Sequence, residues 1–397
     1  MIMEKMTKIG VIIIFCLTQL FIQCTSADNK DAYKKETEQY GEEIVTLRNF
    51  LAESLNMDIK KITYDLNENA FIIDGDVVMP LDQARGNYDS YSLKNTNKTD
   101  QRFSGYIMKF EIASAIQIFI SPEVTSEWQI AINKAIDVWN NTNSGINITA
   151  VTASTSSNVK IIMGNIDSKA TIANAYYPYG GQPGERIMIN TSYINKLNDA
   201  QRINVIIHEL GHIFGLAHTN DPSNSLIPCT PVSEMISIMF SIVSDSTAFT
   251  TYDNIAISTL YPVNEGTKKL YRFKKGQYYF YTVDPCEIID GQNGYVYDGD
   301  LGYLYSTQIS GTVPLYRSIN GSAEKGHKLS KSQALSNDII LGYLYLDQYS
   351  GSTALYCYKN SAQDFYTVEN LGPLLRLTYG FVPHKIVANG KYDGIIF

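Results

Sequence analysis

One motif constrains this chain more than any other feature of its sequence. The pattern H-E-x-x-H-x-x-G-x-x-H runs from His208 to His218. On a helix, His208 and His212 project from the same face one turn apart, so their two imidazoles can bind one zinc ion. Gly215 is free to adopt a positive φ, which would end the helix and let His218 approach the same metal. Three protein nitrogens leave a fourth position for water, the arrangement of a catalytic rather than a structural zinc site.

Glu209 lies beside these ligands and adds a catalytic group. It can take a proton from a zinc-bound water and later pass it to the leaving amine, as the general base of peptide hydrolysis does. Asn198 followed by Gln201 predicts the cap that begins this helix. The alternative is that the histidines are ordinary core or surface residues of an amphipathic helix. The chain has only five histidines, and three of them fall in the motif, which favours zinc.

The sequence around and after the motif resembles the metzincin metallopeptidases. Ser237–Phe240 is similar to their Met-turn, in which Met239 would form a soft apolar floor under the zinc site. Residues 251–262 are similar to the closing helix of that fold. Within the clan, His-Glu-Leu-Gly-His followed by His218-Thr219-Asn220 most resembles the bacterial dual-action HEIGH metallopeptidases. Astacin-like and serralysin-like members have a tyrosine two residues after the methionine; here Ser241 stands there, so a tyrosine ligand or oxyanion stabiliser is not expected.

The resemblance implies an α+β catalytic domain over residues 103–264, with a mixed twisted sheet, a zinc helix and a Met-turn. Apolar spacing predicts a long helix over Ser126–Asn141, with Ser126 and Gln129 in capping-box positions. By the same resemblance, Ile172–Tyr177 would be an edge strand that binds the main chain of an extended substrate running antiparallel to it.

The first residues, 1–24, predict an export signal. Basic residues precede an apolar run from Ile9 to Ile22, which is too short for a comfortable membrane span. Leu20–Cys24 resembles a bacterial lipobox with Cys24 as the lipidated residue, although Gln23 stands where a small residue is usual. The alternative is signal-peptidase cleavage after residues 25–27. Both predict an exported protein, either an outer-membrane or cell-surface lipoprotein or a secreted one, and the cysteine at the end of the run favours the lipoprotein.

A pro-like region and linker are predicted over residues 25–102. Apolar residues at helical spacing predict a helix from Glu36 to Asn56. Short strands follow on both sides of Asp74-Gly75-Asp76. Asn87 to Arg102 is rich in Asn, Ser, Thr and charge, which predicts an exposed linker.

The turn between those strands carries a candidate latency switch. Ile73–Val77 resembles the F-x-G-D segment of astacin propeptides, in which an aspartate reaches the catalytic zinc and displaces its water. The resemblance assigns that role to Asp76, because a carboxylate is a competent zinc ligand. The alternative is that Asp74-Gly75-Asp76 is only a tight turn, for which Asp and Gly are the ordinary residues. The sequence leaves the two interpretations open.

Residues 265–397 are rich in tyrosine and contain an internal repeat. Leu301–Tyr305 recurs as Leu341–Tyr345, and Phe280–Asp284 returns as Phe365–Glu369. Short aromatic strands in three copies predict a closed three-fold all-β domain such as a β-trefoil. The copies resemble an uncharacterised bacterial Leu-Tyr-Arg repeat family. Strand packing explains most tyrosines, and exposed aromatic rings could also bind a glycan or surface ligand.

The cysteines predict no disulfide framework. Beyond the signal and Cys24, only Cys229, Cys286 and Cys357 remain. An odd number scattered over two regions favours small buried hydrophobic residues instead.

Two classes of function fit the sequence. The first is a secreted or surface-tethered zinc endopeptidase acting on proteins or peptides and directed by its repeats. The second is a catalytically silent metzincin-fold adhesin or binding protein that acts through the repeats. The intact motif favours the first. A net charge of −8 argues against nucleic acid as a partner, and only the lipid anchor would bring the chain to a membrane.

Overall fold

The computed structural model describes the chain in stretches, namely 40–54, 58–91, 102–166, 171–220, 225–230, 234–319, 327–333, 335–358, 364–372 and 376–383. The predicted export segment with Cys24, and the central part of the predicted linker, lie outside these described residues. The chain divides into two compact units, Met1–Ile73 with Met79–Lys94, and Asp74–Val78 with Asn95–Phe397. Among the described residues, no helix is long and apolar enough to cross a membrane.

The first unit combines two helices with a β-hairpin. Its elements are α2 (Glu42–Ser54), the 3₁₀ helix η1 (Ile59–Lys61), β1 (Ile62–Asp65), β2 (Ala70–Ile73) and α3 (Leu81–Tyr91). β1 and β2 pair antiparallel. The predicted linker from Asn87 begins too early, because α3 continues to Tyr91. Tyr88 keeps this part of the helix against the unit, since its ring centroid lies 5.2 Å from that of Phe50.

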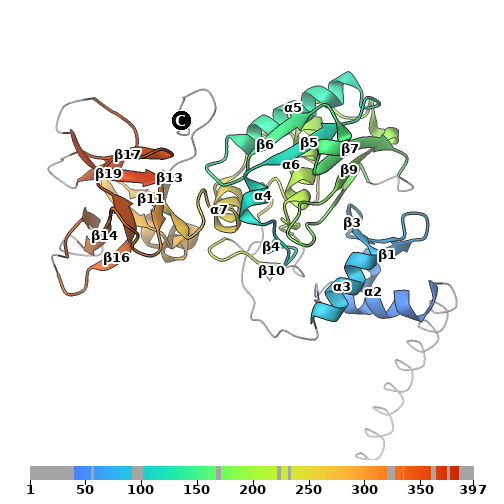
Figure 1. The fold of residues 1–397 in the computed structure, drawn as a ribbon, viewed down its shortest axis with the longest axis horizontal. Coiled ribbons are helices and arrows are strands. Elements are labelled where there is room, and N and C mark those ends of the chain that lie inside the picture. The colour runs from blue at the N-terminus through green and yellow to red at the C-terminus, as the bar shows by residue number, and fades with distance from the viewer. Residues whose placement is uncertain are drawn as a thin grey trace, which may run out of the picture. The chain divides into compact units, whose positions relative to one another are not determined.

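A mixed sheet organises the first part of the second unit (Figure 1). Its strands are β3 (Val77–Pro80, of which Val77 and Val78 belong to this unit), β5 (Ile116–Ile120), β6 (Ile148–Val151), β7 (Val159–Gly164), β8 (Ala173–Tyr176) and β9 (Arg186–Asn190). The strand order is β3-β8-β9-β7-β5-β6. β8 and β9 pair antiparallel and the other neighbours pair parallel, so β3 and β8 run opposite to the rest.

Helices and short elements complete this part of the unit. They are β4 (Arg102–Phe103), α4 (Phe110–Ala113), α5 (Ser126–Asn140), η2 (Ser154–Ser156), η3 (Thr191–Tyr193), α6 (Asp199–Ile213), β10 (Ser225–Leu226) and α7 (Thr251–Leu260). α5 matches the helix predicted from apolar spacing, but the predicted capping box at Ser126 is wrong. Thr125 is the N-cap and makes no side-chain capping bond, while the Gln129 amide instead donates to the carbonyl of Val124 at 2.7 Å.

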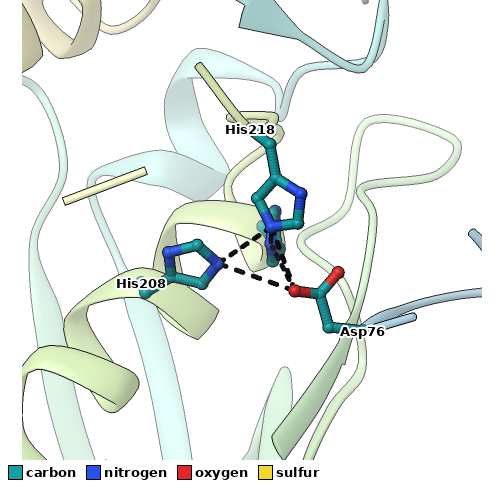
Figure 2. Close-up of side chains that lie close together, drawn as sticks. Asp76, His208 and His218 are labelled. Carbon is teal, nitrogen blue, oxygen red and sulfur yellow. Dashed lines mark hydrogen bonds and ion pairs between the residues drawn. The ribbon is translucent and has the colours of Figure 1, made fainter. Parts of the chain in front are cut away.

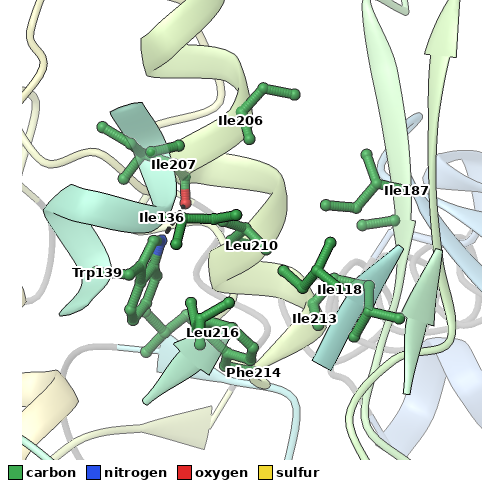
Figure 3. Packing of buried hydrophobic residues seen from close by; sticks show 14 of the residues in the cluster. Ile118, Ile136, Trp139, Ile187, Ile206, Ile207, Leu210, Ile213, Phe214 and Leu216 are labelled. Carbon is green, nitrogen blue, oxygen red and sulfur yellow. Dashed lines mark hydrogen bonds between the residues drawn. The ribbon is translucent and has the colours of Figure 1, made fainter. Parts of the chain in front are cut away.

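The core lies between α5, α6 and the sheet (Figure 3). Trp139 on α5 is fully buried, and its ring meets that of Phe214 edge to face at 4.8 Å between centroids. Its indole Nε1 donates to the carbonyl of Ile207 on α6 at 3.1 Å. This contact fixes α6 against α5, so the position of the histidine helix is set by the core rather than by surface loops.

The prediction that Ile172–Tyr177 forms a free edge strand is wrong for this chain. β8 occupies that stretch, but both of its sides are paired. Val77 and Val78 of β3 lie beside Ala175 and Tyr176 in parallel register. The prediction missed this because β3 comes from a segment almost a hundred residues earlier in the chain, and nothing in the local pattern of β8 records its neighbour.

An all-β region follows α7. Its elements are β11 (Thr267–Lys275), β12 (Tyr278–Thr282), the 3₁₀ segment η4 (Pro285–Gly294), β13 (Val296–Tyr305), β14 (Thr312–Ile319), β15 (His327–Ser330), β16 (Ile339–Tyr345), β17 (Ser352–Tyr358), β18 (Phe365–Thr367) and β19 (Arg376–Pro383). β11, β14 and β17 each pair antiparallel with the two strands that follow them. Their long pairings each contain a register shift next to the tyrosine of a Leu-Tyr-x sequence.

Buried arginines connect these strand groups in a repeated way. Arg272 on β11 donates to the carbonyl of Tyr366 at 3.1 Å, and Arg317 on β14 donates to that of Tyr281 at 3.0 Å. The corresponding position on β17 is Cys357, which is buried and unpaired in the described structure. Each group is thereby tied to the preceding one through the same strand position.

The prediction that no cysteines pair is wrong for two of them. Cys229 and Cys286 form a disulfide, with a sequence separation of 57 residues and Cα atoms 4.4 Å apart. The odd count misled the prediction because Cys357 alone takes the role of a small buried hydrophobic residue. The disulfide joins the loop before the Met-turn sequence to η4 of the all-β region.

The all-β region should be dispensable for the site but not for full stability. Ile255 on α7 is buried in a cluster with Tyr271 and Phe273, so a chain ending at Asn264 would expose it. With Cys229→Ser to remove the unpaired thiol, we expect this chain to fold and cut short peptides, with a free energy of unfolding lower by about 1.5–3 kcal/mol. Chemical denaturation and peptide cleavage measure both. An inactive truncated chain beside an active full chain would make the region part of the catalytic fold.

Candidate metal centre and active site

α6 begins and ends so that it presents the motif. The Asn198 side chain accepts from the Gln201 amide at 2.9 Å, and the Gln201 side chain accepts from the Asn198 amide at 3.2 Å. This is the predicted capping box. The turn after the helix requires Gly215, whose φ is +92° and whose added Cβ would lie 2.3 Å from the carbonyl oxygen of Tyr106. The chain then returns and brings His218 beside the helix.

The structure brings the three predicted histidine ligands together. Nε2 of His218 lies 3.1 Å from Nε2 of His208 and 3.2 Å from Nε2 of His212. Asp76, the predicted switch residue, joins them with its Oδ2 3.0 Å from Nε2 of His218 (Figure 2). The same oxygen lies 3.8 and 3.9 Å from the other two Nε2 atoms. Four candidate ligand atoms from distant parts of the sequence therefore converge on one point.

Hydrogen bonds on the outer nitrogens orient all three rings. Nδ1 of His208 donates to the carbonyl of Ile238 at 2.7 Å, and Nδ1 of His212 donates to that of Leu216 at 2.9 Å. A carboxylate serves the third ring, where Nδ1 of His218 donates to Oδ2 of Asp74 at 3.0 Å.

These outer partners test whether a metal fits. Each is an oxygen that can only accept, so the proton of each ring sits on Nδ1 and the Nε2 lone pair faces the shared point. Three converging lone pairs and a carboxylate need a positive charge between them. Three imidazoles and one carboxylate form a donor set that suits zinc, so the residues present fit the metal that the motif predicts.

The ionisation of the protein groups alone shows the same demand for positive charge. Burial opposes a charge on His218, but the carboxylates of Asp76 and Asp74 outweigh it and raise its pKa to about 10. Burial, reinforced by His208, lowers the pKa of His212 to about 3. The cluster thus holds one positive charge near Asp76 and keeps its neighbour neutral, as a ligand to a cation must be.

Glu209 meets the requirements of a general base in position and surroundings. It is buried, and its Oε2 has no hydrogen-bond partner among the described residues. Burial, reinforced by Asp76, raises its pKa well above the usual range. Glu209 and His208 line a cavity of about 320 Å³, together with Thr171, Phe240 and further residues. A buried carboxylate without a partner beside a cavity has room for a water and for the atoms of a substrate.

The Met-turn lies directly beneath the helix. Met239 is buried, and a Cβ added to Gly211 would lie 2.3 Å from its Sδ. Its backbone is anchored by Asp253, a buried residue of α7 whose carboxylate accepts from Ser237 Oγ at 2.5 Å and from the Ile238 amide at 3.2 Å. The carbonyl of Ile238 in turn orients His208.

Several residues of the site were not predicted from the sequence. Asp253 was considered only as part of a closing helix, and its position three residues after Thr250 was the available signal, since it completes a capping box. Asp74 was considered only as a turn residue. Tyr177, whose ring centroid lies 5.7 Å from that of His212, carried no signal. Ser241 accepts a hydrogen bond from the Asn220 amide group at 2.7 Å, so it serves the loop after the motif.

Comparisons with known proteins agree with this site. Residues 71–234 match the model of the family described as dual-action HEIGH metallo-peptidase, and residues 242–345 match a domain of unknown function. A comparison with curated proteins finds no match. Among solved structures, one of myroilysin is 16% identical with a TM-score of 0.29, covering 38% of this chain and 82% of that one. A second is 15% identical with a TM-score of 0.29, covering 42% and 100%. The family match confirms the resemblance predicted from the sequence and indicates a metallopeptidase.

The contact between Gly211 and Met239 generates a test of the site's floor. Gly211→Ala would push its methyl group into Met239, so we expect a free energy of unfolding lower by about 1–3 kcal/mol and weaker zinc binding. Met239→Ala in the same chain should restore part of both, because it removes the colliding atoms. Chemical denaturation and chelator competition measure the effects, and wild-type stability in Gly211→Ala would show that the floor is not tightly packed.

Proposed function

We propose that this chain, whose residues 71–234 match the dual-action HEIGH metallopeptidases, is a zinc endopeptidase of the metzincin type that hydrolyses proteins or peptides. The observation that carries the proposal is the convergence of three imidazole nitrogens beside the unpartnered carboxylate of Glu209. His208, His212 and His218 would hold the zinc. When bound, zinc acts as a Lewis acid and lowers the pKa of a water molecule at its open position.

The chain's own residues account for the remaining chemistry. Glu209 Oε2 takes the proton of the attacking water, and the same carboxylic acid then donates it to the nitrogen of the leaving amine. Burial of Glu209 and the histidines limits the access of bulk water, which strengthens the electrostatic interactions inside the cleft. Met239 and Asp253 position the ligands through packing and through the backbone of the Met-turn.

The N-terminal turn supports the proposal that the uncut chain is latent. Asp76 stands among the ligands, and its backbone carbonyl accepts from the Ala175 amide on β8 at 2.9 Å. β3 also lies along the side of β8 that the resemblance assigned to the substrate. Asp74 and Gly75 have φ of +51° and +97°, so the tight turn and the switch are compatible: the turn is what directs both carboxylates inward.

We assign the all-β region a separate role in delivery. The three strand groups with matching register shifts and arginine contacts favour a closed three-fold domain of the β-trefoil kind. Tyr305, Tyr345 and Tyr349 are half-buried and lie together, with ring centroids 5.8 and 4.2 Å apart, and such rings can stack on a glycan or surface ligand. The Cys229–Cys286 disulfide favours an oxidising compartment and so supports export, through a lipid at Cys24 or free secretion.

Removing the base while keeping the ligands tests the catalytic assignment. Glu209→Ala should bind about one zinc per chain yet lose nearly all cleavage, by roughly 10²–10⁴-fold, because no group moves the proton. His212→Ala, the matched control, should lose zinc and cleavage together. Bound metal and cleavage of a diverse peptide pool, with and without chelator, measure both. Full activity of Glu209→Ala would refute the assignment, and zinc binding without cleavage in the processed wild type would favour the silent adhesin.

Replacing Asp76 tests latency. The uncut wild type should be inactive, and proteolytic cleavage within residues 87–102 should release activity. Asp76→Ala should cut peptides without that cleavage, because a ligand position is open to water. Asp82→Ala, which removes an exposed carboxylate on α3, is the control and should remain latent. Full activity of the uncut wild type, or equal latency of both variants, would exclude the switch.

A further inference from the structure

The turn that carries Asp76 carries a second carboxylate, and we propose that Asp74 is a positioning residue through which the N-terminal segment retains the metal. The inference rests on the proposed zinc site and concerns how tightly that site holds a divalent cation before and after processing. It assigns the segment two contacts with the centre, one through Asp76 and one through the outer nitrogen of His218.

The outer partners of the three histidines are not equivalent. The partners of His208 and His212 are backbone carbonyls of the Met-turn and of the turn after α6. They remain in place whenever the peptidase part is folded. The partner of His218 is the side chain of Asp74, which lies 144 residues earlier in the chain and outside the matched motif. Only this third contact can be withdrawn without unfolding the peptidase part.

His218 is also the ligand whose ring depends most on an outer partner. The other two rings project from α6, which is fixed by its capping box and by Trp139. His218 lies beyond Gly215 in an irregular stretch, where neighbouring amides hold the backbone: Ala217 donates to the carbonyl of Arg102 and Thr219 to that of Met239, each at 2.9 Å. These bonds fix its Cα but not its ring rotation, so the Asp74 contact has the larger share in aiming Nε2.

The turn is built to deliver both carboxylates together. The Thr171 hydroxyl donates to the carbonyl of Gly75 at 2.9 Å, and the Ala175 amide donates to that of Asp76 at 2.9 Å. These two bonds hold the turn to residues just before and within β8. Asp74 then reaches Nδ1 and Asp76 reaches Nε2 of the same imidazole, so one ring is gripped at both nitrogens.

The consequence is that processing weakens the site while it activates it. When the turn leaves, the centre loses the Asp76 ligand, and His218 loses the partner that aims its ring. The latent chain should therefore retain zinc against a chelator better than the processed chain. Outer partners of this kind typically change metal affinity by about 10–100-fold.

Chelator competition on the full, uncut chain tests the role of Asp74. Asp74→Ala should bind zinc about 10–100-fold more weakly than wild type. Asp74→Asn should lose less, because its amide oxygen still accepts from Nδ1 of His218. Asp82→Ala should match wild type. The visible spectrum of bound cobalt should change with Asp76→Ala, which removes a ligand. With Asp74→Ala at saturating cobalt it should keep the wild-type band pattern.

The outcomes separate this inference from the proposed function. Equal zinc affinity in wild type, Asp74→Ala and Asp74→Asn, with His212→Ala losing zinc, would overturn the role of Asp74 and leave the peptidase intact. Failure of the wild type to bind zinc would overturn both. Thermal unfolding of the metal-free variants checks that each is folded. If Asp74→Ala is not, the comparison of Asp74→Asn with wild type decides, and an affinity equal to wild type together with an unchanged rate of zinc loss would refute the proposal.

Discussion

The hydrogen bonds on the outer nitrogens of the three histidines are the interactions on which the rest of the site depends. Each passes the position of a larger structural element to one metal-facing nitrogen. Ile238 passes on the position of the Met-turn, which Asp253 ties to α7. Leu216 passes on the position of the turn at the end of α6. The sheet, the helices and the Met-turn thus act together as a frame for three imidazoles.

A cluster of inward-facing lone pairs and carboxylates is costly to assemble without a cation. The surrounding core bears that cost through burial of apolar side chains, among which Trp139 and its neighbours fix α6. Glu209 adds a buried carboxylate that no described residue satisfies. Unsatisfied polar groups of this kind concentrate where a protein works on a ligand, so the least stable part of the structure is also its functional part.

The sequence was sufficient for everything that follows from short-range pattern. The motif located the three histidines and Glu209, helical spacing located α5 and α6, and the Asn198 cap matched in detail. What it missed depends on pairs of residues far apart in the chain: β3 beside β8, Asp74 beside His218 and the Cys229–Cys286 disulfide. No periodicity or motif records such pairs, because each partner looks locally like a strand, a turn or a hydrophobic residue.

The disulfide has a consequence for a chain that is expected to be cut. Cys229 and Cys286 lie on either side of α7 and of the passage into the all-β region. A peptide bond broken anywhere between them leaves two fragments that remain covalently joined. An internal nick there would change the mobility of the protein on a reducing gel and leave it unchanged in mass on a non-reducing one, so the peptidase part keeps the all-β region until a reductant is present.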